Sequence, residues 1–217
     1  MNNEVWDYLY GYFIALEESY SKISILVANA QPTSTNEIMG NDVGAAAPID
    51  CLPIYQEIAK SLEECQKQLK PLLTKMELKY LLCALIFHCD ETVLTKKLPT
   101  NRLIPTLCEW PGLQKKMLHC RDGGERFFNH LDKLLQHSRD YKMAIEVYYF
   151  CLKQGFVGCY FNDPKKIQYY LTRCAEVITK NVRLRAHVVR GAGSEYKNLR
   201  DEPSNESQSG VVHGAFA

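Results

Sequence analysis

Hydrophobic residues recur along this chain in steps of three and four, the spacing that places side chains on one face of an α-helix. This spacing predicts helices over residues 4–27, 54–69, 78–93, 127–135 and 167–182, and a shorter helix over about 111–120. Residues 143–152 are apolar nearly all round, which is typical of a buried helix. No segment alternates in the manner of a strand. We therefore predict an all-α protein with about seven or eight helices in two packed bundles, with the helix over 78–93 at the centre of the core.

Several predicted helices carry sequence signals at their ends. Thr74 and Glu77 form a capping-box pattern, in which the threonine hydroxyl and the glutamate carboxylate satisfy backbone donors at a helix start. Asp163 and Pro164 suit the N-cap and first position of the helix over 167–182. Gly155 is placed to end the preceding helix in a left-handed conformation.

Two polar segments interrupt the helical pattern. Residues 31–50 are rich in Pro, Gly, Ser, Thr and Asn, which predicts a mobile loop, and residues 191–217 are predicted to be a disordered polar tail. Residues 1–190 would then form the folded helical domain. Four basic residues precede the tail: Lys180, Arg183, Arg185 and Arg190. They fit either the solvated face of the last helix or the cytoplasmic flank of a membrane anchor.

Composition narrows the class of protein. Of 217 residues, 46% are hydrophobic and 24% charged, which is typical of globular domains, and the net charge of +1 gives no field to attract nucleic acid. The longest apolar run is shorter than the ~20 residues that a membrane-spanning helix needs. The chain has nine cysteines, an odd number, and its first residues do not have the pattern of a secretory signal. Neither observation favours a framework of disulfide bonds. We therefore expect reduced cysteines packed in the core, without disulfides or bound metal.

Candidate chemical groups gather at the end of the helix over 78–93. His88 and Cys89 have the right chemistry for zinc, and together with Asp90 and Glu91 they offer the groups of a hydrolase. Consecutive residues on a helix point about 100° apart, however, so they form neither a chelating pair nor a triad. The glycine pairs of the chain lack the Lys-Ser/Thr of a phosphate-binding loop, which favours turns and helix caps.

Asp90 and Glu91 are the more informative pair. Both lie near the C-terminal end of a predicted helix, where the helix dipole disfavours negative charge, and neither has a cation three or four residues away. A structural explanation is a salt bridge to another helix, through Arg102, Arg121 or Arg126. The other explanation is an acidic surface that binds a partner.

Three blocks of the sequence resemble the DotU/IcmH/TssL family, the inner-membrane components of type IVB and type VI secretion systems. The first block runs from Cys89 to Leu94 and contains Asp90 and Glu91, with Trp110 downstream. The second block consists of Gly123, Gly124, Glu125, Arg126, Phe127 and Phe128. The third block comprises residues 146–149, followed by Gly155, Phe156, Val157, Gly158, Cys159 and Tyr160. Family members often carry a basic residue where this chain has Cys159.

The resemblance implies a hook-shaped, all-helical, non-enzymatic scaffold without a cofactor. It implies a cytoplasmic domain anchored in the bacterial inner membrane by a C-terminal helix, bound to an IcmF/TssM-like membrane protein, with possible baseplate contacts and homodimerisation. Since residues 210–217 are too short to span a bilayer, we expect such an anchor to follow the polar tail. We favour a type IVB (DotU-like) system slightly over a type VI (TssL-like) system. The alternatives from other classes are a small cytosolic hydrolase or metalloprotein and a soluble helical adaptor.

Overall fold

The computed structural model describes residues 3–30, 49–98 and 110–195, with side chains described up to residue 180. The chain divides into two units, Met1–Ile178 and Thr179–Ala217. The first unit holds the core and every feature discussed below. In the second unit, the described residues continue the last helix.

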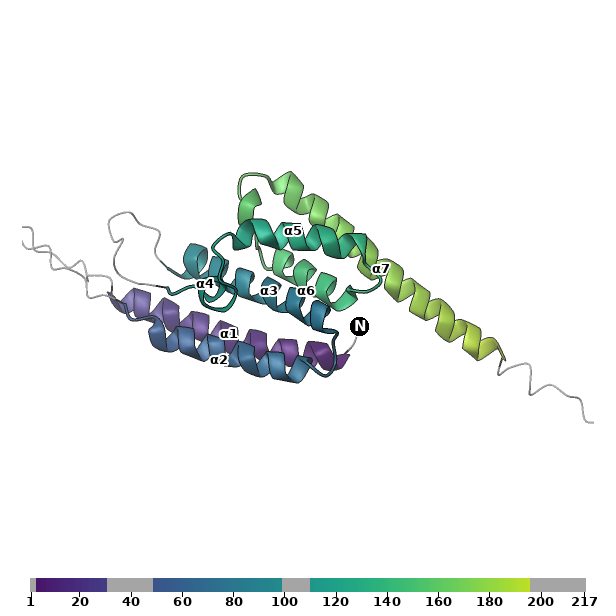
Figure 1. The fold of residues 1–217 in the computed structure, drawn as a ribbon, viewed down its shortest axis with the longest axis horizontal. Coiled ribbons are helices and arrows are strands. Elements are labelled where there is room, and N and C mark those ends of the chain that lie inside the picture. The colour runs from purple at the N-terminus through teal and green to yellow at the C-terminus, as the bar shows by residue number, and fades with distance from the viewer. Residues whose placement is uncertain (1–2, 31–48, 99–109, 196–217) are drawn as a thin grey trace, which may run out of the picture. The chain divides into compact units, whose positions relative to one another are not determined.

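The described residues form seven α-helices and no β-strand, which confirms the predicted all-α class. The elements are α1 (Asn3–Ala30), α2 (Leu52–Leu69), α3 (Lys75–Thr92), the π-helix η1 (Val93–Lys97), α4 (Leu113–Met117), α5 (Gly123–Gln136), α6 (Lys142–Lys153), the 3-10 helix η2 (Gly158–Tyr160) and α7 (Pro164–Glu195). In the first unit, α1 and α2 lie side by side in one layer, α3 and α6 in the next, and α5 beyond them (Figure 1). One continuous hydrophobic core joins these layers.

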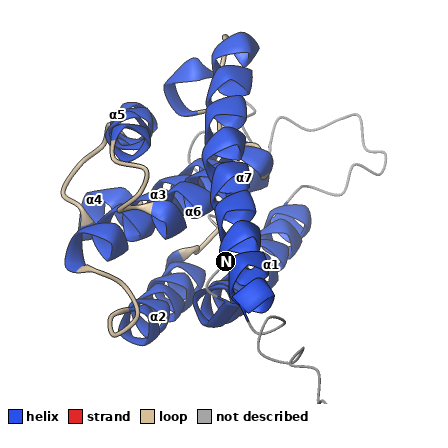
Figure 2. Cartoon of the chain, turned by 90° about the vertical axis from the view of Figure 1, so that its right-hand side faces the viewer, coloured by secondary structure: helices blue, strands red, loops and turns tan. Residues whose placement is uncertain are grey.

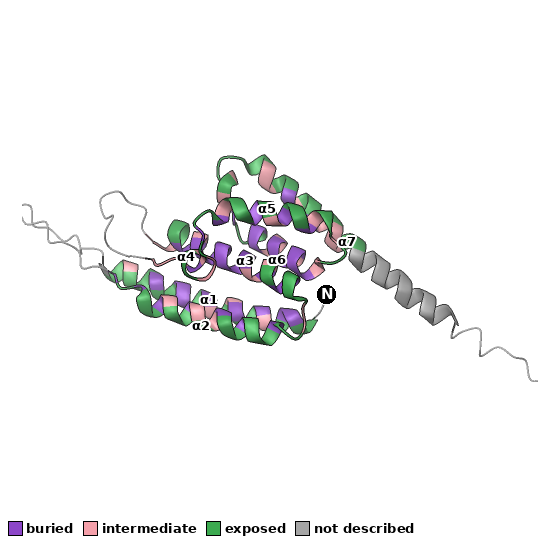
Figure 3. Cartoon of the chain, viewed as in Figure 1, coloured by how far each residue is buried: buried purple, intermediate pink, exposed green. Residues whose placement is uncertain are grey.

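Helix α3 lies at the centre of this core, as its hydrophobic spacing predicts. Its buried residues cover almost the whole circumference: Glu77, Leu78, Leu81, Cys83, Ala84, Leu85, Ile86, Phe87, His88, Cys89, Asp90 and Thr92. Buried positions predominate along α3 and α6, as Figure 3 shows. The polar groups at the end of α3 are therefore surrounded by protein, and their partners must come from other segments.

The predicted capping box at the start of α3 forms only in part. The Thr74 hydroxyl accepts a hydrogen bond from the Glu77 backbone N–H at 3.2 Å, as expected for an N-cap. The Glu77 carboxylate does not return to this helix end. It accepts a hydrogen bond from the Met143 backbone N–H at 2.9 Å, at the start of α6. Burial raises the pKa of Glu77, and these backbone donors of α6 oppose that rise. Glu77 thus joins α3 to α6.

The other sequence signals at helix ends are confirmed. Gly155, which follows α6, has a φ of +88°, in the left-handed region. The Asp163 carboxylate accepts a hydrogen bond from the Lys166 backbone N–H at 3.0 Å, and Pro164 is the first residue of α7. Helix α7 extends past the predicted end at residue 182, to Glu195.

Most of the predicted loop over 31–50 and of the predicted tail over 191–217 lies outside the described residues, as do the side chains of Arg183, Arg185 and Arg190. No helix in the described part of the chain is long and apolar enough to cross a membrane.

The prediction that all cysteines are reduced is wrong for Cys51, which is disulfide-bonded. The other seven cysteines in the described ranges are free thiols, and all of them except Cys159 are buried. A disulfide requires two sulfur atoms to meet in space, and sequence spacing alone does not show which cysteines do so.

Candidate functional site

Asp90 binds the start of α4. It lies in the last turn of α3 and has no exposed surface. Its Oδ1 accepts hydrogen bonds from the Trp110 indole Nε1–H and the Leu113 backbone N–H, each at 2.8 Å, and its Oδ2 accepts one from the Gln114 backbone N–H at 2.8 Å. The residue before α4 is Gly112, which has no side chain to cap the helix. Asp90 supplies the missing acceptor from a distant helix.

Glu91 binds the turn that follows α6. Its two carboxylate oxygens accept hydrogen bonds from the backbone N–H groups of Val157 and Gly158, each at 2.7 Å. Burial raises the pKa of Glu91, and the two backbone donors and the nearby Lys96 act in the opposite direction. The two neighbouring acids therefore point to different segments, and each holds the start of a short helix.

These contacts settle what Asp90 does. The prediction that Asp90 contributes to an exposed acidic surface is wrong, because its side chain is fully buried and both oxygens are occupied by donors of the same chain. The Glu91 carboxylate is likewise engaged by backbone donors. The salt bridge to an arginine is not formed either: the ion pairs of the described residues include neither acid, and Arg126 pairs with Asp122 at 2.6 Å. Arg102 lies outside the described ranges.

The glycine motifs allow two backbone segments to touch. Gly158 has a φ of +50°, and a Cβ there would lie 2.7 Å from the Gly124 carbonyl oxygen. A Cβ on Gly124 would in turn lie 3.1 Å from the Gly158 backbone. A Cβ on Gly123 would lie 2.5 Å from both the Phe87 ring and the Gln114 side-chain oxygen, which accepts the Gly123 N–H at 2.9 Å. The start of α5 thus packs against η2 and α3 with no room for side chains.

The aromatic residues of the motifs form one cluster. The rings of Phe127 and Phe156 have centroids 4.1 Å apart, and Phe128 lies 4.6 Å from Tyr160 and 4.9 Å from Tyr170. Phe127, Phe128, Phe156 and Tyr170 are buried, and Tyr160 is half-buried. The turn after α6 therefore carries Phe156 into the core and joins α5 to the start of α7.

Each tryptophan donates its indole N–H to an acidic residue. Besides its bond to Asp90, Trp110 packs edge-to-face on Tyr55 of α2, with ring centroids 5.4 Å apart. Trp6 of α1 donates to the Glu146 carboxylate of α6 at 2.9 Å. These pairs connect the α1–α2 layer to the rest of the core, and the Trp6 contact was not predicted from the sequence.

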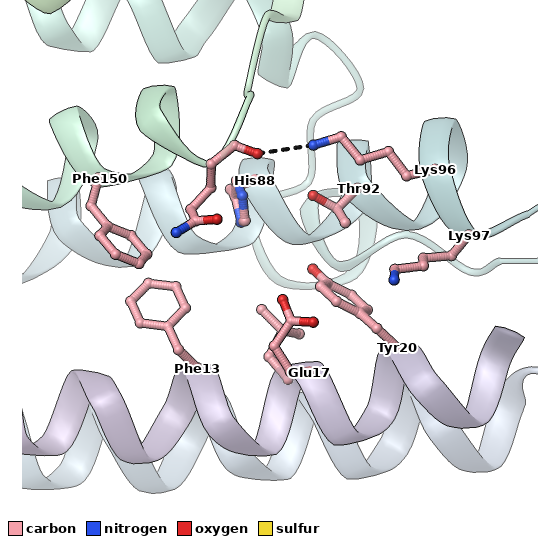
Figure 4. Close-up of a pocket in the computed structure, with 10 residues that line it drawn as sticks. Phe13, Glu17, Tyr20, His88, Thr92, Lys96, Lys97 and Phe150 are labelled. Atoms are coloured by element: carbon pink, nitrogen blue, oxygen red, sulfur yellow. Dashed lines mark hydrogen bonds between the residues drawn. The ribbon is translucent and has the colours of Figure 1, made fainter.

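A pocket of about 270 Å³ lies between α1, the end of α3 with η1, and the end of α6 (Figure 4). Its lining residues are Phe13, Leu16, Glu17, Tyr20, His88, Thr92, Lys96, Lys97, Phe150 and Gln154. The Lys96 Nζ donates to the Gln154 carbonyl oxygen at 2.9 Å. Burial and the charge of Lys96 lower the pKa of His88 to about 4. His88 is therefore neutral at physiological pH.

The four groups of the hydrolase alternative do not converge. Cys89 has no exposed surface, and burial raises the pKa of its thiol, which disfavours the reactive thiolate. His88 faces the pocket, while Asp90 and Glu91 hold separate backbone segments. Within the described ranges, no three His, Cys, Asp or Glu residues are grouped as metal ligands would be.

Two contacts of this region, one made by Gln114 and one by the Glu77 carboxylate, were not predicted from the sequence. Gln114 links Asp90 to Gly123, because its backbone donates to the first and its side chain accepts from the second. Glu77 joins α3 to α6. Each contact joins residues nine or more positions apart in the sequence, so hydrophobic spacing carries no signal for it. The sequence contains one indirect signal for the Asp90 contacts: Gly112 cannot cap the helix that follows it, so the backbone donors of that helix start need an acceptor from elsewhere.

A family model matches most of the chain, and two solved structures share its fold. The family model described as Type VI secretion system protein DotU matches residues 46–213. DotU from Francisella novicida has a similar solved structure, with a TM-score of 0.50 and 19% identity, over 74% of this chain and 96% of that chain. The cytoplasmic domain of TssL from Acinetobacter baumannii also has a TM-score of 0.50, with 23% identity, over 76% of this chain and 95% of that chain. No curated protein matches the sequence. The two solved structures share the fold of this chain. The family model spans most of the sequence, and this match confirms the resemblance that the motif blocks indicate. The chain therefore belongs to the DotU family of type VI secretion system proteins.

Proposed function

We propose that this chain is a non-enzymatic docking component of a bacterial secretion system, and that it binds an IcmF/TssM-like inner-membrane protein. The observation that carries the proposal is the match of residues 46–213 to the DotU family. The contacts of the motif residues support it, because the buried acids and the touching glycines fix the turns between helices. Such fixed turns suit a scaffold that presents a stable surface.

The type VI branch is the version that we propose first. The description of the matching family names that system, and one similar structure is a TssL domain. This choice reverses the slight preference for type IVB that the sequence motifs gave. In this version the chain faces the cytoplasm at the inner membrane, held there by an anchor that follows the described domain, and it contacts baseplate proteins as well. Homodimerisation belongs to the same proposal.

Co-purification tests the proposal. The chain is expressed with the cytoplasmic part of the IcmF/TssM-like protein from the same genome, and separately with that of a type IVB system. We expect a stable complex with the first partner that survives size-exclusion chromatography. Two folded proteins that elute separately at micromolar concentration would contradict the proposed docking. A complex with the type IVB partner alone would contradict the type VI branch.

The hydrolase alternative has its own test. It requires a reactive thiol at Cys89, whereas burial makes this thiol inert in the native state. We expect iodoacetamide to alkylate Cys159 in the native protein and Cys89 only after unfolding, as measured by peptide mass spectrometry. Rapid alkylation of native Cys89 would favour the enzyme.

A further inference from the structure

One face of α3 borders an open groove that the family motifs do not use. The groove has a volume of about 780 Å³ and lies between the end of α2, the outer face of α3 and the end of α4. Its lining residues are Gln66, Lys70, Leu73, Lys75, Met76, Leu78, Lys79, Leu82, Cys83, Ile86, Met117 and Leu118. Figure 2 labels the helices α2, α3 and α4, which contribute the residues that line the groove.

The floor of the groove is apolar and adaptable. Leu78 and Ile86 are nearly buried, Leu82 is half-buried, and Met76 is 45% exposed. Met76 and Met117 line the groove from α3 and α4. Methionine side chains are flexible and polarisable, so they adjust to the shape of a bound apolar group.

The charge on the groove is of one sign. Lys70, Lys75 and Lys79 are exposed residues that line it, and none of its lining residues is acidic. Lys75 and Lys79 lie one helical turn apart on α3. An occupant would therefore meet an apolar floor and a row of ammonium groups.

We propose that this groove binds an acidic amphipathic helix of a partner protein. The lining residues of α3 run from Lys75 to Ile86, which at 1.5 Å per residue is a length of roughly 16 Å, or about three helical turns. A helix laid along this face places apolar residues at i, i+3, i+4 and i+7 on the floor. Its carboxylates, one turn apart, then face Lys75 and Lys79. The inference rests on the proposed docking role only in assuming that a protein partner exists.

The test uses the purified chain and two synthetic helical peptides. The first carries leucines at the spacing given above with glutamates on both flanks, and the second replaces every glutamate by lysine. Fluorescence anisotropy measures the Kd of each labelled peptide. We expect the acidic peptide to bind and its affinity to fall as salt is raised, since exposed charges are screened. We expect the basic peptide to bind at least about tenfold more weakly, because like charges then face each other.

Matched variants locate the binding site. Lys75→Glu with Lys79→Glu should weaken binding of the acidic peptide at least about tenfold. The control reverses two exposed lysines outside the groove, Lys133→Glu with Lys153→Glu, and should change the Kd by less than about twofold. Both variants change the net charge equally, so a general electrostatic effect would appear in both.

A second pair of variants tests the apolar floor. The double variant Met76→Ala, Met117→Ala should weaken binding about fivefold or more. The control is Leu94→Ala, which truncates a side chain that is 47% exposed and lies outside the groove, and it should leave the Kd unchanged. Thermal melting of each variant verifies the fold.

Several results would overturn the inference. One is equal affinity for the acidic and basic peptides, and another is full binding by the Lys75→Glu, Lys79→Glu variant. A third is self-association of the unliganded chain that this variant abolishes, which would make a second copy the occupant. If the peptides fail while the membrane partner still co-purifies, the groove inference falls and the proposed function stands.

Discussion

Replacing Asp90 by alanine should destabilise the domain far more than an ordinary surface change. The substitution leaves three donors without an acceptor: the buried Leu113 backbone N–H, and the partly buried Trp110 indole N–H and Gln114 backbone N–H. Each unsatisfied buried donor costs about 1–3 kcal/mol. Because the three share one partner, their costs do not add fully, and we expect a total loss of about 3–5 kcal/mol. This is a large part of the 5–15 kcal/mol that is typical for the stability of a domain.

The assay is urea unfolding followed by far-UV circular dichroism, with tryptophan fluorescence as a second probe. Asp7→Ala is the control, since Asp7 is an exposed aspartate of α1, and its cost should stay within about 0.5 kcal/mol. Asp90→Asn keeps one acceptor oxygen and should lose less, about 1–3 kcal/mol. An unchanged unfolding midpoint for Asp90→Ala would refute the capping role derived from the structure.

A double-mutant cycle isolates the indole bond. Trp110→Phe keeps a ring against Tyr55 but removes the N–H donor to Asp90. In the Asp90→Ala background the same change removes an unsatisfied donor, so it should cost less than in the wild type. We expect a coupling energy of about 0.5–3 kcal/mol between the two positions. Additive effects would show that the 2.8 Å contact contributes nothing.

Three further predictions follow from the backbone, burial and cysteines. Gly158→Val should lower the free energy of unfolding by about 1–3 kcal/mol or more, because φ is +50° and the new Cβ would lie 2.7 Å from a backbone oxygen. Gly11→Ala, where the new Cβ has no atom within 4 Å, should instead stabilise α1 by about 0.5–1 kcal/mol. Equal melting temperatures of the two variants would contradict both expectations. Burial lowers the pKa of His88 to about 4, so the native state binds fewer protons than the unfolded chain below pH 6.5. The contribution of His88 to stability should therefore fall by about 3 kcal/mol between pH 6.5 and 4. His130 acts in the same direction, and the raised pKa values of Glu77 and Glu91 act in the opposite one. The contribution of His88 is measured as the difference in pH dependence between the wild type and His88→Gln in urea melts. Thiol titration of denatured protein purified without reductant should find seven thiols, since Cys51 is in a disulfide, and a count of nine would contradict that bond.

The sequence by itself determined the helices and most of their ends. Hydrophobic spacing placed α1, α2, α3, α5 and α6 within a few residues of their observed bounds, because burying one face of a helix is a local property of period 3.6. Thr74, Asp163 and Gly155 act on backbone groups within four residues of their own positions. The motif blocks identified the family for the same reason, since each is a short run of consecutive residues.

Only the tertiary structure decided where the charged side chains at the ends of α3 find their partners. Asp90 and Glu91 are neighbours in sequence, yet one binds the start of α4 and the other the turn after α6, 66 residues away. Glu77 likewise leaves its own helix end for α6. A buried carboxylate is stable only where donors surround it. Apart from the Trp110 indole, the donors to these three acids are backbone N–H groups, which every sequence carries at almost every position. The residue types therefore indicate that a buried acid needs hydrogen-bond donors. Which backbone groups supply those donors is determined only by the packing of distant segments.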